Sequence, residues 1–288
     1  MRALTLLLLA LFVLAPMPGR AARSYDTCTA FVSTVPAVIA SPGTYCLNAN
    51  LVTSMASGAA IAINASNVTL DCDDFRVDDL GAGAATTAIG ISASNQNYVT
   101  IRHCNVGGFQ QGIVLADNGS GKGANLIEDN HLDGNTNVGI SSQGTRSIVR
   151  RNIVLDTGTT TQHANAIDGI VVDGDSQVVD NVVSGVTSHG ASFGVYGIHF
   201  SNVEAGGTVN RNRVSNVVPA AGDASYGIFL GGTSAVARDN SIFGVPQVNN
   251  TAIDCSGSHD IVQGTIAGGF KINNLGQCGN GGGNNFHP

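Results

Sequence analysis

A Gly-Ile dipeptide recurs along most of the chain at intervals of 22 to 30 residues, and it constrains the fold more than any other feature. Clear copies begin at Gly90, Gly112, Gly139, Gly169, Gly197 and Gly227, and weaker copies begin at Ala60 and Ala252. Between them, short β-branched runs alternate with Asn, Gly and Asp, which is typical of strands and turns and lacks any helix-length apolar period. A strand unit repeated at this length predicts a solenoid in which each repeat forms one coil.

A second pattern follows each Gly-Ile copy and usually ends on asparagine. The aligned positions are Cys104, Asn130, Asn152, Asn181, Asn212 and Asn240. Stacked coils place equivalent residues above one another, so the amides of this column can hydrogen-bond to each other at a buried corner. Asparagine also tolerates the left-handed conformation that a turn requires. We interpret the column as a stabilising asparagine ladder.

The residue before each ladder position alternates between acid and base along the chain. This column contains His103, Asp129, Arg151, Asp180, Arg211 and Asp239. Opposite charges on adjacent strands attract, whereas like charges repel. We predict that the charged column sets the register of the coils and the solubility of the protein, and a ligand surface is the alternative.

The Gly-Ile strand, the asparagine ladder and the coil length resemble the right-handed parallel β-helix proteins of the pectin lyase-like superfamily, over roughly residues 59–269. The resemblance implies an all-β fold: a single right-handed parallel β-helix solenoid of about eight coils, at residues 59–269. We expect an N-terminal cap at 22–58, and a C-terminal cap with a flexible tail at 270–288. The resemblance implies less about activity, because this superfamily includes lyases, hydrolases, epimerases and non-catalytic proteins.

The start of the chain predicts export. Arg2 precedes an apolar run that ends at Ala15, and small residues around Ala21 permit cleavage, so residues 1–21 have the pattern of a signal peptide. The run is too short for a membrane span, and we expect no membrane anchor. The protein is therefore expected to be secreted, either to the periplasm or outside the cell.

Six cysteines follow the predicted cleavage position, an even number that suits an oxidising compartment. Adjacency along the chain favours the pairs Cys28–Cys46, Cys72–Cys104 and Cys255–Cys278, although other connectivities remain open. The closely spaced cysteine pairs of a zinc site are absent from the sequence. The net charge of −7 gives no general attraction for nucleic acid, so nucleic acid is not an expected partner.

Candidate functional residues gather in the later repeats. Long connections at 156–166, 185–195 and 217–225 would form a wall beside consecutive coils and create a groove on the Gly-Ile face. Alternation places His199 and Phe229 on the outward side of their strands. The groove is predicted to use Tyr226, Phe229 and Asp168 for substrate binding, next to Tyr196 and His199. The alternative is that these rings form a covered apolar cluster.

Asp173 and Asp175 are the second candidate pair. In an extended strand their carboxylates lie about 7 Å apart, near the ~6.5–9.5 Å of an inverting glycosidase. An Asp-Gly turn is the simpler alternative, and a calcium site that uses these carboxylates is another. No other cofactor is indicated.

Catalytic members of the resembled superfamily are matched only in part. The polygalacturonase motifs correspond to Asp168, to the split pair Asp173 and Asp175, and to His189 before Gly190, and the basic Arg-Ile-Lys motif is missing. A lyase or epimerase would need His199 or His189 beside Tyr196 to move a proton alpha to a carboxylate. The expected catalytic residues are His199, His189, Tyr196, Asp173 and Asp175.

Two functions remain open from the sequence. The first is a secreted β-helix protein that binds a polysaccharide or cell-surface glycan and cleaves it. Its first-choice enzyme class is polysaccharide lyase, and its second choice is glycoside hydrolase. The other is a non-catalytic β-helix that binds a glycan or another surface, or that has a structural role. The sequence does not specify the oligomeric state.

Overall fold

The structure is a computed structural model that describes residues 27–117, 121–162, 166–173, 175–189, 194–201, 206–220, 222–244, 249–256, 258–269 and 278–287. The predicted signal peptide at residues 1–21 lies outside these ranges, as do residues 270–277 of the expected tail.

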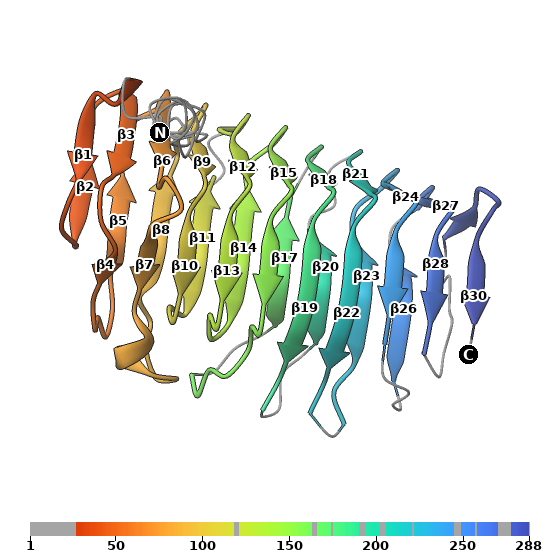
Figure 1. Ribbon diagram of the computed structural model, residues 1–288. Helices are drawn as coiled ribbons and strands as arrows, with labels where there is room; N and C mark the ends of the chain where they lie inside the picture. Colours follow the sequence, from red (N-terminus) through yellow and green to blue (C-terminus); the bar gives the residue numbers. More distant parts are fainter. Residues whose placement is uncertain are drawn as a thin grey trace, which may run out of the picture.

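The described chain folds into a parallel β-solenoid with three sheets (Figure 1). Sheet 1 contains the Gly-Ile strands: β2 (Ala37–Ile39), β5 (Ala59–Ile63), β8 (Ile89–Ser94), β11 (Gln111–Ala116), β14 (Val138–Gln143), β17 (Ile167–Val172), β20 (Val195–Phe200), β23 (Ser225–Leu230) and β26 (Asn250–Cys255). Sheet 2 contains β1 (Ala30–Val32), β3 (Gly43–Leu47), β6 (Val68–Asp71), β9 (Thr100–Arg102), β12 (Leu126–Glu128), β15 (Ile148–Arg150), β18 (Gln177–Val179), β21 (Thr208–Asn210), β24 (Val236–Arg238), β27 (Ile261–Gln263) and β29 (Gly279–Asn280). Sheet 3 contains β4 (Leu51–Val52), β7 (Arg76–Asp78), β10 (Asn105–Gly107), β13 (His131–Asp133), β16 (Ile153–Leu155), β19 (Val182–Thr187), β22 (Arg213–Val218), β25 (Ser241–Phe243), β28 (Ile266–Gly268) and β30 (Asn285–His287).

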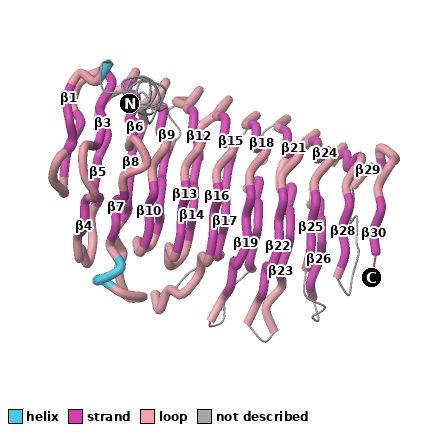
Figure 2. The backbone as a smooth tube through the Cα atoms, in the orientation of Figure 1, coloured by secondary structure: helices cyan, strands magenta, loops and turns pink. Residues whose placement is uncertain are grey.

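Each coil passes once through sheets 1, 2 and 3, and eight coils follow one another from β5 to β28 (Figure 2). A short 3₁₀ helix, Leu80–Ala82, lies between β7 and β8. The all-β parallel solenoid of about eight coils is therefore confirmed. The three sheets also continue into β1 to β4, within the segment expected as the N-terminal cap, and sheets 2 and 3 continue into β29 and β30 near the C-terminus.

The glycine of each Gly-Ile pair is required because successive coils approach closely at that point. A Cβ on Gly197 would lie 2.5 Å from the carbonyl oxygen of Gly227 and 2.4 Å from Cγ1 of Val214. The adjacent Ile198 is fully buried in the core, whereas Tyr196 and His199 are half-buried on the outer face. The glycine thus interrupts the strand alternation, so that the residue before it and the residue two after it both face outward.

The asparagine ladder is confirmed at the turn between sheets 2 and 3. Its asparagines are 0–2% exposed. From Asn152 onward, each Oδ1 accepts hydrogen bonds from the backbone N–H and the side-chain amide of the preceding asparagine, as Asn181 does for Asn152 at 2.9 and 3.0 Å. The ladder begins at Cys104, whose N–H donates to Asn130 Oδ1 at 3.0 Å.

The left-handed turn conformation, which we expected at the ladder asparagines, occurs one residue earlier. The residues of the charged column have φ between 51° and 57°. With the sharp turn at this preceding residue, each asparagine can point its side chain into the solenoid and reach the next coil. The charged side chains then project outward.

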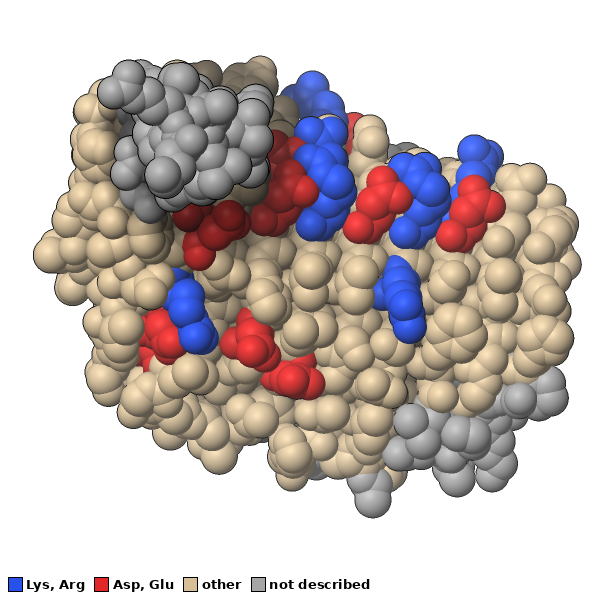
Figure 3. All heavy atoms as spheres, in the orientation of Figure 1, with Lys and Arg blue, Asp and Glu red and all other residues tan. Residues whose placement is uncertain are grey.

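The charged column forms ion pairs between neighbouring coils, as the register argument predicts. The Asp129 carboxylate contacts the Arg151 guanidinium at 2.7 Å, and Asp180 contacts Arg211 at 2.8 Å. The hydrogen bond from Arg151 lowers the pKa of Asp129, and the one from Arg211 lowers the pKa of Asp180. Figure 3 shows these acids and bases alternating in a row along the upper part of the molecule.

The three disulfides expected from adjacency are confirmed: Cys28–Cys46, Cys72–Cys104 and Cys255–Cys278. Disulfides of this kind point to an oxidising environment. Within the described ranges, no helix has the length and apolar character needed to cross a membrane.

Candidate functional site

Four aromatic side chains meet on the outer face of sheet 1, on the neighbouring strands β20 and β23. Tyr196 stacks on His199 with ring centroids 4.2 Å apart, and on Tyr226 at 5.1 Å. Phe229 packs edge-on against His199 at 5.3 Å and against Tyr196 at 5.5 Å. The strand register explains the cluster, because Tyr196 pairs with Tyr226 and His199 pairs with Phe229. We call these four residues the aromatic cluster.

A carboxylate of the preceding coil holds the histidine of the cluster. Asp168 Oδ1 lies 2.9 Å from His199 Nδ1, and the two side chains are only 8% and 16% exposed. A carboxylate at Nδ1 orients the imidazole and directs Nε2 toward the other side of the ring. The prediction from the sequence placed Asp168 and His199 in the same region but did not include their contact. Alignment of the Gly-Ile strands was the available signal, because β17 and β20 are adjacent and in register.

The two tyrosines of the cluster are kept in their neutral form. Burial first, and then the nearby Tyr226, Asp168 and Asp254, together raise the pKa of Tyr196 to about 12. Burial and Asp254 also raise the pKa of Tyr226. A phenol with a raised pKa is a poor general base at neutral pH, but it remains a hydrogen-bond donor. Tyr196 is therefore better suited to contact a ligand than to remove a proton.

Acidic groups flank the aromatic cluster on both sides. Asp168 lies on β17, and Asp254 follows Phe229 in the outward column on β26. None of the strands of sheet 1 contains Lys or Arg. The strands of this face therefore provide carboxylates, rings and one histidine, without a fixed positive charge.

Asp173 and Asp175 are not part of this arrangement. Both follow the C-terminal end of β17, whereas Asp168 lies near its start. Asp173 accepts a hydrogen bond from the Ser201 hydroxyl, and its carbonyl accepts one from Ser176 at 2.7 Å. Asp175 Oδ1 accepts the backbone N–H of Arg146 at 2.6 Å. These contacts are those of residues that stabilise a turn between sheets 1 and 2.

His189 is exposed and lies in the connection that leads from β19 to β20. Within the described residues, no ring contact or hydrogen bond joins it to His199. The structure brings together Asp168, Tyr196, His199, Tyr226 and Phe229, and it does not bring His189, Asp173 or Asp175 to them.

The connections beside sheet 1 differ from the expected wall of three loops. The described part of the first, 156–162, extends toward earlier coils, where the Thr161 N–H donates to Ala84 O at 3.0 Å and Gln162 Nε2 donates to Ala85 O at 2.8 Å. It meets the connection between β7 and β8, an early connection that is also long. Parts of all three loops, including His163, lie outside the described residues.

The described residues contain no group of three or more His, Cys, Asp or Glu side chains that could hold a metal ion. The calcium alternative thus has no cluster of ligands in this part of the chain.

Comparisons with known proteins extend the fold assignment. No family model and no curated protein matches this sequence. A solved structure of the Dettilon tailspike protein is similar, with a TM-score of 0.51 and 14% sequence identity over 90% of this chain and 60% of that one. This chain thus matches less than two thirds of the tailspike. At this identity the likeness shows the parallel β-helix alone, and the pectin lyase-like superfamily remains a resemblance of sequence pattern.

Proposed function

We propose that the protein binds a glycan on the outer face of sheet 1, with the aromatic cluster as the central contact surface. The single observation that carries this proposal is the stack of Tyr196 on His199 and Tyr226, with Phe229 packed edge-on beside it. Aromatic rings give a sugar a rigid apolar surface, and the tyrosine hydroxyls and the imidazole add hydrogen bonds. The fold likeness to a tailspike protein is consistent with this role and assigns no residue to it.

The charges of this face favour a glycan that is not anionic. A uronate would approach Asp168 and Asp254, and no Lys or Arg on the strands of sheet 1 would balance its carboxylate. Repulsion between like charges makes the free energy of binding less favourable, and the effect is larger where water is partly excluded. We therefore place neutral glycans ahead of pectate or alginate.

Cleavage is the second candidate, and the Asp168–His199 contact is the observation that favours it. In a β-elimination, His199 Nε2 would take the proton alpha to a uronate carboxylate. A C=C bond would form as the C–O bond to the leaving group breaks, and the leaving oxygen would take a proton from water. Such a substrate is the anionic kind that the face disfavours. Hydrolysis by Asp168 and Asp254 is also disfavoured, since three strand spacings separate them by about 14 Å, beyond the ~9.5 Å limit.

Binding is tested with the mature protein on a panel of neutral, amino and uronic glycans, followed by calorimetry on the best ligand. Tyr196→Ala and Phe229→Ala should each weaken binding by about 5- to 30-fold, since one stacking ring contributes about 1–2 kcal/mol. Phe243→Ala is the matched control, because this phenylalanine is 46% exposed on sheet 3. The proposal fails if folded protein binds no glycan, or if all three variants lose affinity equally.

Cleavage is tested on the same panel by ultraviolet absorbance of unsaturated uronate and by new reducing ends, with and without calcium. An unsaturated product that disappears in His199→Ala would establish a lyase at this face. Reducing ends without unsaturation would indicate hydrolysis and direct attention to Asp173 and Asp175. Binding without any product would leave the non-catalytic function.

A further inference from the structure

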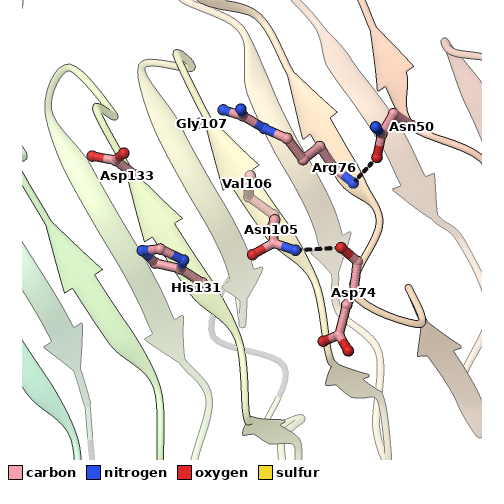
Figure 4. A pocket seen from close by; sticks show the side chains of 8 residues that line it. All are labelled: Asn50, Asp74, Arg76, Asn105, Val106, Gly107, His131 and Asp133. Carbon is pink, nitrogen blue, oxygen red and sulfur yellow. Dashed lines mark hydrogen bonds between the residues drawn. The ribbon is translucent and has the colours of Figure 1, made fainter. Parts of the chain in front are cut away.

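A separate hollow of about 410 Å³ opens on the outer face of sheet 3, among the early coils (Figure 4). It is lined by Asn50, Asp74, Arg76, Asn105, Val106, Gly107, His131 and Asp133. Its size is within the range of ~300–1,000 Å³ that is usual for small-molecule sites. The polar lining makes a sugar-sized, hydrogen-bonding ligand more suitable than an apolar one.

One lining position of the hollow, Gly107, has no side chain. Asp78, Gly107 and Asp133 occupy equivalent places on β7, β10 and β13. A Cβ on Gly107 would lie 2.6 Å from the carbonyl oxygen of Asp133 and 3.9 Å from the Arg76 guanidinium, so the close approach of the coils requires glycine here and no side chain projects from this position. The next coil fills the same column with Leu155.

Several contacts fix the walls of the hollow. The Asn105 amide donates to the carbonyl oxygen of Asp74, and Asn50 Oδ1 accepts the backbone N–H of Arg76 at 2.9 Å. The Arg76 guanidinium pairs with Asp78 at 3.1 Å. Figure 4 shows Arg76 extending along one side of the hollow, with His131 and Asp133 on the opposite side. A ligand would therefore meet polar groups whose positions are already set, which reduces the entropy cost of binding.

The charge balance of the hollow favours a ligand with a positive charge. Arg76 is neutralised by Asp78, and among the described residues neither Asp74 nor Asp133 takes part in an ion pair. The lining of the hollow therefore includes two exposed carboxylates without an ion-pair partner among the described residues. We propose that this hollow binds an amino sugar, with Asp133 or Asp74 contacting its ammonium group and Asn105 its hydroxyls.

The site is independent of the proposed function, since it lies on another sheet and uses none of the residues of the aromatic cluster. The probe is the glucosamine disaccharide, compared with its N-acetylated form and with glucuronate. Calorimetry at low salt should show the amine form binding at least about tenfold more tightly than the uncharged form. The difference should shrink at 1 M salt, where the screening length falls to about 3 Å.

Asp133→Asn should lower the affinity for the amine form about three- to tenfold, because it removes the charge at constant shape. The matched control is Asp239→Asn, an exposed aspartate of the charged column that belongs to a distant coil. Equal losses in both variants, or no preference for the amine form, would overturn the proposal. Binding lost in Tyr196→Ala instead would assign the amino sugar to the aromatic cluster and would also overturn it, while the proposed function would stand.

Discussion

Replacement of Asn181 in the middle of the ladder should lower the stability of the whole solenoid. Its Oδ1 accepts the backbone N–H of Asn152 at 2.9 Å, and its Nδ2 donates to the carbonyl oxygen of Val149 at 2.9 Å. Asn181→Ala would leave both buried groups without these partners, at about 1–3 kcal/mol each. Together with the cavity, we expect a loss of about 3–5 kcal/mol in the free energy of unfolding.

Thermal and urea unfolding, followed by circular dichroism, would measure this loss. For a chain of this size it corresponds to a fall in Tm of about 6–20 °C. Gln177→Ala is the matched control, because Gln177 is exposed on β18 of the same coil and should change stability by less than about 0.5 kcal/mol.

A second variant separates hydrogen bonding from packing. Asn181→Leu fills the space but supplies neither donor nor acceptor, so it should be about as unstable as Asn181→Ala. If Asn181→Leu regained the stability of the unmodified protein, the cavity would be the cause and the ladder argument would be refuted. Glycan binding by any of these variants should be unchanged below their unfolding temperatures, because the ladder lies at the corner between sheets 2 and 3.

Two further predictions concern charge. Asp180→Arg should lower stability at low salt, because it removes the hydrogen bonds from Arg211 and places a third base between Arg151 and Arg211. Unfolding measured at two salt concentrations checks this prediction. An equal loss of stability in Gln177→Arg would contradict it. Asp260→Asn should raise stability at pH 7. Asp260 is fully buried, its Oδ2 has no hydrogen-bond partner among the described residues, and burial raises its pKa. The folded state therefore holds this proton more tightly than the unfolded state, so ionisation costs stability as the pH rises above about 4. The advantage of Asp260→Asn should disappear in unfolding curves at pH 3.5, and an equal advantage at both pH values would show another cause.

The fold could be predicted because each coil repeats the same physical constraint. Gly197 has no room for a Cβ against the next coil, and Asn181 must satisfy buried backbone groups. Since every coil meets the same two requirements, the residues recur at recognisable spacing. The disulfides were also predictable, because Cys72 and Cys104 occupy comparable places in successive coils.

The left-handed turn position and the course of the loops were harder to predict. The turn conformation belongs to Asp180 rather than Asn181, and a column that alternates between acid and base gives no conformational signal of its own. Thr161 contacts Ala84, 77 residues earlier, by hydrogen bonds that no repeat encodes. The hollow at Gly107 was missed because a single glycine in a strand has many structural explanations.

Departures from the repeat mark the place where we propose that a glycan binds to this scaffold. The outward column of sheet 1 carries the small or aliphatic residues Ser92 and Val114 in early coils, then His199 and Phe229 in later ones. Core packing does not require this change, because these side chains point away from the core. Strands of one sheet are about 4.8 Å apart, so the face from β17 to β26 extends for about 14 Å along the solenoid axis. Such a strip of side chains suits an extended chain that crosses several coils, and for this reason a polymeric glycan fits the face better than a single small molecule.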